Sequence, residues 1–327
     1  MRSVLTACLA VTVATACAVP VAHSAAAAAD AGYPTKPVRL IVPFSPGGTN
    51  DILARMAAIH LTDTLGKQVI VDNRAGAEGI IGTEMAVKAV PDGYTLIILS
   101  SAYVMNPAVR RMPYDATKDL DIIAKVATSA TVLCVGPLLP VNSLKELLAA
   151  AKTKPGQITL ASSGGFQHFA SALFRSLTGQ DFNIVLYKGT FPAMMDVIGG
   201  QLHANILPIV PSLPQLRAGK MKGLGMGTLK RSALLPELQT LDELGVKGFD
   251  AANTYTFAVT ARTPPAITKR LYTLITDYMR LPDTEKKLVA MGAELDIRSG
   301  EEMRKLIPAE IAKWTKVAIA AGMPREQ

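Results

Sequence analysis

Three short segments that combine glycine with small hydroxyl side chains each lie between an expected strand and an expected helix. The first comprises residues 44–51, with the sequence Phe-Ser-Pro-Gly-Gly-Thr-Asn-Asp. Gly47 and Gly48 allow positive φ angles and a close approach of the backbone to a ligand. The free N–H groups and the dipole at the start of the following helix can then hold an anion without any charged side chain.

The same segment also fits a purely structural turn. Thr49, Asn50 or Asp51 can cap the helix that follows, and a capped turn needs no ligand. A nucleotide-binding loop is not indicated, because the Gly-Lys-Ser/Thr ending of such loops is missing. Taken alone, the segment leaves both a structural turn and an anion site open.

The second and third segments repeat this arrangement later in the chain. Residues 162–168 (Ser-Ser-Gly-Gly-Phe-Gln-His) and 187–192 (Tyr-Lys-Gly-Thr-Phe-Pro) offer hydroxyl and backbone N–H groups where helices are expected to begin. Pro192 suits a first helical turn, and residues 100–101 (Ser-Ser) can add a fourth contact after a strand. The predicted ligand-binding residues are Phe44, Ser45, Gly47, Gly48, Thr49, Ser100, Ser101, Ser162, Ser163, Gly164, Gly165, His168, Lys188 and Thr190.

Residue patterns typical of catalysis are weak in this chain. His60 is expected on the surface of a helix, His203 has no partner at metal-ligand spacing, and the sequence has no Cys-x-x-Cys pair. Ser163 and His168 can be imagined as a hydrolase pair, but the Gly-x-Ser-x-Gly elbow is missing. We therefore expect a binding protein without a metal or cofactor, and keep a secreted hydrolase as the less favoured alternative.

Strand-like and helix-like segments alternate along the chain, which predicts parallel sheets covered by helices. The expected strands are residues 38–42, 69–71, 95–99, 158–161, 184–187 and 204–207. The expected helices between them are residues 51–65, 79–89, 143–152, 167–178 and 192–199. Longer β segments at 120–135 and 255–260 interrupt the alternation and suggest two crossings between two α/β lobes.

We predict that residues 33–133 together with 252–327 form the first lobe and that residues 134–251 form the second. Helices at 265–279, 283–291 and 300–320 are expected to pack back on the first lobe. A mature chain of about 300 residues suits two domains of ordinary size. In such folds ligands bind at the carboxyl ends of strands, in the crevice between the lobes.

The beginning of the chain predicts export. Arg2 is followed by an almost unbroken apolar run, residues 4–21, and then by small residues at 22–29. This is the layout of a secretory signal peptide, which we place at residues 1–28 with cleavage near 24–29. A membrane anchor and a lipoprotein lipidated at Cys17 are the alternatives. After Asp30 no apolar run is long enough to cross a bilayer, so a periplasmic protein is expected.

Charge and cysteine content limit the partners further. The formal net charge is +8, and it becomes +7 when Arg2 is lost. The basic residues are scattered and aromatics are few, which argues against nucleic acid and favours attraction of anionic solutes. Cys134 alone remains after the signal, and its apolar neighbours predict a buried thiol without a disulfide. We expect a monomer.

Several longer motifs agree with one known family. They comprise residues 42–51 with Arg55, residues 71–79 with Gly82, residues 91–96, 114–115 and 162–164, His168, and residues 187–189 and 196–201. Over nearly the whole mature chain the sequence resembles the Bug family of periplasmic solute receptors, also called TctC-like, which serve tripartite tricarboxylate transporters.

The resemblance implies a type II periplasmic-binding-protein fold, in which two α/β lobes close on the ligand. Such receptors commonly hold a carboxylate through backbone groups and small hydroxyls, often with bridging waters. This sequence departs from the family at Leu202-His203, at Lys188, at Tyr255-Thr256 and at residues 165–167. We expect residues around Phe166, Lys188 and His203 to influence which solute is bound.

The sequence therefore predicts a periplasmic receptor for a small organic anion. A dicarboxylate, a tricarboxylate, an acidic amino acid or a related carboxylate fits the three segments. The expected partners are this solute and the permease subunits of a tripartite membrane transporter. A receptor that reports its bound state to a membrane signalling protein would carry the same pocket and remains the alternative.

Overall fold

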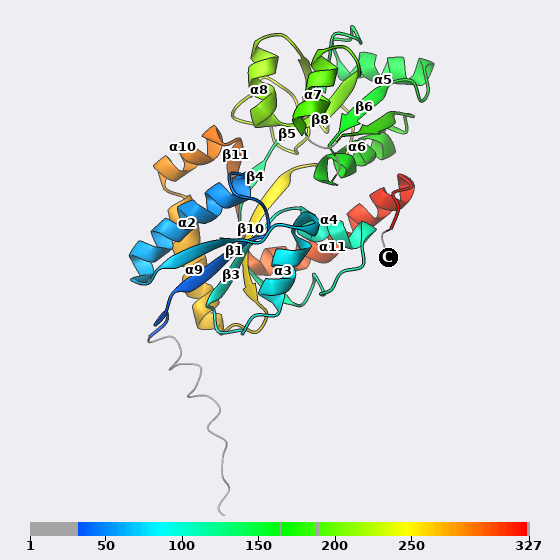
Figure 1. Cartoon of the computed structure of the whole chain (residues 1–327). Helices are drawn as coiled ribbons and strands as arrows, with labels where there is room; N and C mark the ends of the chain where they lie inside the picture. The colour runs from blue at the N-terminus through cyan, green and yellow to red at the C-terminus, as the bar shows by residue number, and fades with distance from the viewer. Residues whose placement is uncertain (1–31, 164, 188–189, 326–327) are drawn as a thin grey trace, which may run out of the picture.

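The computed structural model of the chain describes residues 32–163, 165–187 and 190–325. The expected signal peptide, Gly164 and Lys188 lie outside these ranges. The described residues form two β-sheets, each covered by helices, and Figure 1 shows them as two lobes. None of the helices within the described ranges is long and apolar enough to cross a membrane.

The first lobe is built on a six-stranded sheet. Its strands, from one edge to the other, are β11 (Ala293–Ser299), β4 (Leu120–Ser129), β10 (Asn253–Thr260), β3 (Thr95–Leu99), β1 (Val38–Val42) and β2 (Val69–Asn73). The strand β1 is parallel to both β2 and β3, whereas β10 is antiparallel to β3 and β4. The carboxyl ends of β1 and β3 therefore meet at one edge of the sheet, where two of the predicted site segments begin.

Helices cover both faces of this sheet, as its continuous apolar strands require. One face packs against α2 (Thr49–Leu65), α9 (Pro265–Met279) and α10 (Pro282–Ala290). The other face packs against α3 (Ile80–Val87), α4 (Ala102–Val109) and the first part of α11 (Gly300–Ala320). A short 3₁₀ turn, η1 (Ala77–Gly79), precedes α3.

The second lobe is built on a five-stranded sheet. Its strands, in spatial order, are β7 (Asn183–Leu186), β6 (Thr159–Ser162), β8 (Ala204–Pro208), β5 (Thr131–Val135) and β9 (Lys222–Met226). Two helices, α5 (Leu144–Thr153) and α6 (Gly165–Thr178), pack on one face. The other face, which contains the fully buried Cys134, packs against α7 (Thr190–Ile198) and α8 (Ile209–Arg217).

The chain passes between the sheets along strands. The strand β4 ends at Ser129 and β5 begins at Thr131, so one residue separates the two sheets. The chain returns through β10 after β9. The two crossings expected from the sequence are present. Because β5 belongs wholly to the second sheet, we propose that the lobes divide at residue 130 instead of the expected 133/134, and we keep the return at 251/252 as a proposal.

The last helix is a third connection between the lobes. Ile307, in the first half of α11, packs in the first lobe, whereas Trp314, Val317 and Ala318 pack in the core of the second. The Trp314 ring meets the Phe169 ring of α6 edge to face, with 5.6 Å between centroids, and Figure 1 shows α11 running from the lower lobe toward α6. The helix thus spans the boundary instead of covering the first lobe alone.

Several elements differ from the sequence expectation. The structure adds two helices and two strands that the sequence analysis did not predict, namely α4, α8, β9 and β11. The helix α2 begins at Thr49, two residues before the expected start at Asp51. The helices expected at 265–279 and 300–320 have the expected ends.

Replacing Trp314 by alanine should be strongly destabilising. The indole is 2% exposed, and its removal leaves a cavity where α11 meets α6, so we expect a loss of about 3 to 5 kcal/mol. Urea-induced unfolding measures the change. Ile319→Ala on the same helix is the control, because Ile319 is 75% exposed. Equal stability of Trp314→Ala and the control would show that α11 is not an essential joint.

Candidate functional site

The first predicted segment is held from beneath by a buried carboxylate. Asp51 is 3% exposed, and its Oδ2 accepts a hydrogen bond of 2.9 Å from the Gly47 N–H. Asn73 at the end of β2 donates to Asp51 Oδ1 at 2.9 Å and to the Phe44 carbonyl at 3.1 Å. Arg55 Nε donates to Asp51 Oδ2 at 2.9 Å. One residue of α2 therefore ties together the loop, its own helix and the neighbouring strand.

These hydrogen bonds show which groups of the segment are already used within the protein and which stay available to a ligand. Gly47 has φ +87°, so glycine is required there, but its N–H is already used by Asp51. The N-cap of α2 is Gly48, and no side chain caps it. The capping role considered for Thr49, Asn50 or Asp51 is therefore wrong. The uncapped start of α2 keeps the backbone donors and the dipole that favour an anion.

Two predicted residues of the first lobe contact the crossing strand β10. The Ser101 hydroxyl donates to the Ala252 carbonyl at 3.1 Å and accepts a bond of 2.9 Å from the Thr254 N–H. Thr49 shares a side-chain hydrogen bond with Tyr255, whose burial raises the pKa of its phenol. Ser101 and Thr49 therefore link the binding loops to the crossing between the lobes.

In the second lobe, three polar side chains meet at the start of α6. Gln167 Oε1 accepts from the Ser163 N–H at 3.1 Å and from the Ser163 hydroxyl, and Thr190 Oγ1 lies 3.4 Å from the same oxygen. Gln167 is 4% exposed, and its Nε2 has no hydrogen-bond partner among the described residues. A buried amide donor without a partner is costly, so it marks a place where an acceptor is favoured.

The two lobes face each other at Glu78 and Gly165. Glu78 Oε1 lies 3.4 Å from the position that a Cβ on Gly165 would occupy. The same oxygen is 3.8 Å from Arg110 Nη2, and Asn106 Nδ2 donates to the Glu78 carbonyl at 3.2 Å. A small cavity of about 10 Å³ beside Glu78 is also lined by Phe44, Ser100 and Asn106. A carboxylate of the first lobe thus reaches the start of α6 in the second.

The sequence analysis missed Glu78 and Gln167 as site residues. Both lie within motifs that it quoted. The sequence clue for Glu78 was its position between two glycines in Gly-Ala-Glu-Gly, which indicates a tight turn. In the structure Glu78 has φ +54° and ψ +36°, a left-handed conformation that is rare outside glycine. The signal for Gln167 was a buried polar residue at an expected helix start, which only the packing of α6 makes visible.

Three other residues lie apart from this arrangement. His168 lines a separate surface pocket with Arg175, and burial, followed by the charge of Arg175, lowers the pKa of its imidazole. His203 Nδ1 is 2.8 Å from the Thr159 hydroxyl, at the amino ends of β6 and β8. His203 therefore lies at the opposite end of the sheet from the start of α6, apart from the candidate site. Phe166 is half-buried and packs against the core of the second lobe.

Ser162 is 1% exposed, and its carbonyl accepts from the Tyr187 N–H at 2.7 Å. Ser45, Gly48 and Ser100 are more accessible than Ser162. Gly164 and Lys188, two further predicted contacts, lie outside the described residues. Within residues 32–163, 165–187 and 190–325, no group of three His, Cys, Asp or Glu side chains could hold a metal ion.

Two larger cavities are also present, and the first shares Ser100 with the small cavity beside Glu78. One of about 420 Å³ lies between the crossing strands, β11 and α11, and is lined by Ser100, Ser101 and charged side chains of both signs. Lys125 and Asp296 form an ion pair of 2.5 Å in its wall. The other, of about 700 Å³, lies in the second lobe beside β9 and contains none of the predicted site residues.

A family model and a sequence relative both point to the same family of transport receptors. The family model described as tripartite tricarboxylate transporter family receptor matches residues 53–323. The protein BugT of Bordetella pertussis is 34% identical over 295 residues, which cover 89% of this chain and 90% of BugT.

Solved structures show the same two-lobed fold. The Rpa4515 protein of R. palustris with adipate is 34% identical with a TM-score of 0.74, over 89% of this chain and 98% of that one. MatC of Rhodopseudomonas palustris with bound malate is 25% identical with a TM-score of 0.71, over 87% and 99%. The predicted two-lobed periplasmic-binding-protein fold is confirmed.

The Asp51 network should make stability depend on acid. Burial alone would raise the pKa of Asp51, but hydrogen bonds from Arg55, the Gly47 N–H and Asn73 lower it to about 2. A carboxyl with a lowered pKa stabilises the fold above its unfolded value near 4, by about 2 kcal/mol here. This contribution should be lost as the pH falls from about 4 to 2.

Asp51→Asn should remove this contribution at pH 7 and flatten the fall in stability between pH 4 and 2. Urea unfolding at several pH values measures both effects. Asp63→Asn is the matched control, because Asp63 is an exposed carboxylate of the same helix. A variant at Asp51 that retains the wild-type acid profile would contradict the role of the network.

Proposed function

The chain belongs to the tripartite tricarboxylate transporter receptor family, and from this premise we propose that it is a periplasmic receptor that delivers a small organic anion to a membrane transporter. The Bug resemblance seen in the sequence is confirmed by the family match and by BugT. We also propose that residues 1–28 are the signal peptide that directs export.

One observation carries the anion proposal: the buried amide of Gln167 has a donor without a partner at the start of α6. This donor lies beside Ser163 and Thr190. Carboxylate oxygens accept such hydrogen bonds strongly, because the acceptor is charged. The bound adipate and malate of two relatives support a carboxylate as the solute.

We propose that each lobe contributes one helix start. The segment from Phe44 to Thr49 would hold the solute from the first lobe, and residues 162–165 with Lys188 and Thr190 would hold it from the second. Helix starts suit this task because their donors are fixed in the backbone and need little reorganisation. Water excluded on closure would strengthen the same hydrogen bonds, and retained waters could bridge the rest.

Glu78 would then narrow the choice of solute. Its carboxylate approaches the start of α6 from the first lobe, so a second charged group of the solute, beyond the carboxylate held by Gln167, would lie beside it. Two negative charges about 6 Å apart repel by about 1.4 kcal/mol at an effective dielectric constant of about 40. We propose that Glu78 disfavours a second carboxylate at this end of the solute and favours a neutral or donor group there.

The hydrolase alternative loses support from the geometry. The Ser163 hydroxyl donates to Gln167, and among the described residues no hydrogen bond joins it to His168. The family is one of receptors, and we propose that the protein has no catalytic activity. A receptor for a signalling partner would use the same pocket, and uptake of the solute by cells separates it from transport.

A carboxylate screen with one variant tests the proposal. Adipate and malate, compared with neutral and cationic solutes, should raise the unfolding temperature of the wild-type protein, since a ligand stabilises the state that it binds. Gln167→Glu preserves the acceptor for Ser163 but replaces the free donor with a charged oxygen. We expect it to lower carboxylate affinity by about 100-fold in calorimetric titration.

The control for this variant is Gln157→Glu, which adds the same charge at an exposed position of the second lobe. It should bind like the wild type. Stabilisation by cationic or neutral solutes alone would refute the anion proposal. Unchanged carboxylate affinity in Gln167→Glu would remove Gln167 from the site.

Glu78→Gln tests the selection of solutes. We expect the affinity for adipate to rise about tenfold, because the repulsion of about 1.4 kcal/mol is lost. The affinity for adipamate, in which one carboxylate is an amide, should change much less. Titrations of both solutes measure this ratio, with Glu285→Gln as an exposed control in the first lobe. An adipate affinity that is unchanged or lower would contradict the role of Glu78.

A further inference from the structure

A groove of about 700 Å³ lies in the second lobe, far from the helix starts of the binding site. It begins where β5 ends, at Val135 and Gly136, and continues along the start of β9. The strands β5 and β6 run in opposite directions, because β5 is antiparallel to β8 and β6 is parallel to it. The end of β5 is therefore opposite the end of β6, where Ser162 and the proposed solute site lie.

The groove has an apolar floor beside a sheet edge. Leu139, Val141, Leu216 and Leu235 belong to its lining. The strand β9 is the outermost of the five-stranded sheet. Its far end is covered, because the Met226 N–H donates to the Gln239 carbonyl. The first residues of β9 thus offer an edge with a hollow next to it, a geometry that suits an extended polypeptide.

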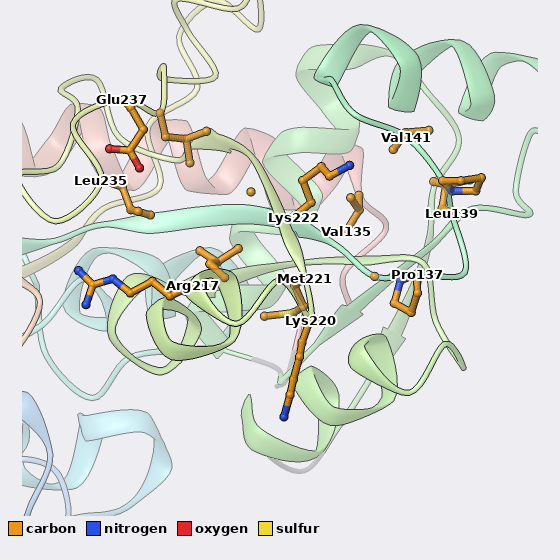
Figure 2. A pocket seen from close by; sticks show the side chains of 16 residues that line it. Val135, Pro137, Leu139, Val141, Arg217, Lys220, Met221, Lys222, Leu235 and Glu237 are labelled. Atoms are coloured by element: carbon orange, nitrogen blue, oxygen red, sulfur yellow. The ribbon is translucent and has the colours of Figure 1, made fainter.

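The rim of the groove is basic. Arg217, Lys220 and Lys222 belong to its lining, with Glu237 as the acidic residue among them. Figure 2 shows Lys222 between apolar side chains, Arg217 at one side, and Lys220 pointing away from the others. Arg217 and Lys220 are exposed and form no ion pair within the described residues. Lys222 donates to Asn142, a neutral partner. The rim therefore has unneutralised positive charge above an apolar floor.

We propose that this groove docks an acidic segment with apolar anchor residues, belonging to the membrane transporter that receives the solute. The proposal rests on the proposed function, since it assigns a surface to the delivery step. Apolar side chains of the segment fill the hollow, and its carboxylates pair with Arg217, Lys220 and Lys222. Complementary charge steers such encounters and sets their partner.

The apolar lining of the groove favours a protein segment over a membrane surface. Lipid headgroups meet a flat or convex basic patch, whereas apolar lining inside a hollow is reached only by inserted side chains. The position at the distal end of the second lobe also leaves both the solute site and the crossing strands free. A partner can therefore contact this surface without displacing the solute.

A direct binding experiment tests the groove without the solute. The probes are a ten-residue peptide of alternating Leu and Glu and its counterpart of alternating Leu and Lys. We expect the wild-type protein to bind the Glu peptide, with affinity that falls as salt is added. Arg217→Glu/Lys220→Glu should lose this peptide by at least tenfold and gain the Lys peptide.

The matched control is Lys145→Glu/Lys152→Glu, which changes the net charge equally on two exposed cations of α5 in the same lobe that have no ion pair in the described part of the chain. It should bind both peptides like the wild type. No binding of the Glu peptide at millimolar concentration, or equal loss in the control, would overturn the groove as the site. Vesicles of phosphatidylglycerol that bind in place of the peptide, and lose binding in the groove variant, would overturn the protein partner.

Solute uptake by cells tests the transporter as the occupant. The groove variant should bind adipate with wild-type affinity in titration but support uptake at least tenfold more slowly, whereas the α5 variant should support normal uptake. Normal uptake with the groove variant would overturn the proposal. A wild-type protein that binds no carboxylate would instead refute the proposed function, and the peptide result would still decide the groove.

Discussion

The buried carboxylate of Asp51 is the constraint on which the first half of the site depends. A loop with two adjacent glycines has many conformations, and each must be excluded if its backbone donors are to point at a solute. Asp51 selects one by accepting from the Gly47 N–H, while Asn73 fixes Asp51 and the Phe44 carbonyl from the neighbouring strand. The loop is therefore positioned by contacts within its own lobe, and it is preorganised before any partner arrives.

The second constraint is that two kinds of connection join the lobes. The crossing at residue 130 is short, and Ser101 and Thr49 tie the binding loops to β10. The helix α11 adds a long bridge whose Trp314 is buried in the second lobe. The Trp314 end of α11 therefore packs against α6 and connects it to the first lobe, where Ile307 of the same helix is buried. This couples the start of α6, and thus Gln167, to the helix on the opposite side of the boundary.

Much of this architecture follows from local sequence. Strands β1 and β3 and helices α9 and α11 have the ends expected from their periodicity, because each is strongly apolar on the faces that it buries. The missed helices α4 and α8 contain Pro107 and Pro214, which argue against a helix in sequence. The missed strand β9 contains two glycines, which weaken strand preference. Their structures come from tertiary packing, which a local pattern does not contain.

The candidate site also contains contacts that local sequence patterns cannot predict. The sequence indicates that Gly47 needs a conformation open mainly to glycine, because Pro46 and Gly48 on either side of it are typical turn residues. It does not reveal that Asn73, on another strand, completes the turn, because that contact depends on the register of β2 against β1. His203 shows a related limit. A histidine near a glycine pair looks like a pocket residue until the direction of its strand shows that it lies at the opposite end of the sheet.

The strained turn at Ala77 and Glu78 connects the binding loop of the first lobe to the start of α6. Both residues have positive φ, and a left-handed conformation costs a non-glycine residue about 1 to 2 kcal/mol. The turn persists because it is packed tightly on the binding loop: added side chains at Gly79 and Gly82 would meet Phe44 and Pro43. The loop that Asp51 fixes thus fixes Glu78 in turn, and Glu78 is a first-lobe carboxylate that reaches the start of α6. Strain of this kind is retained where surrounding structure demands it, so the charge at the mouth of the site is a consequence of the same network that shapes the loop.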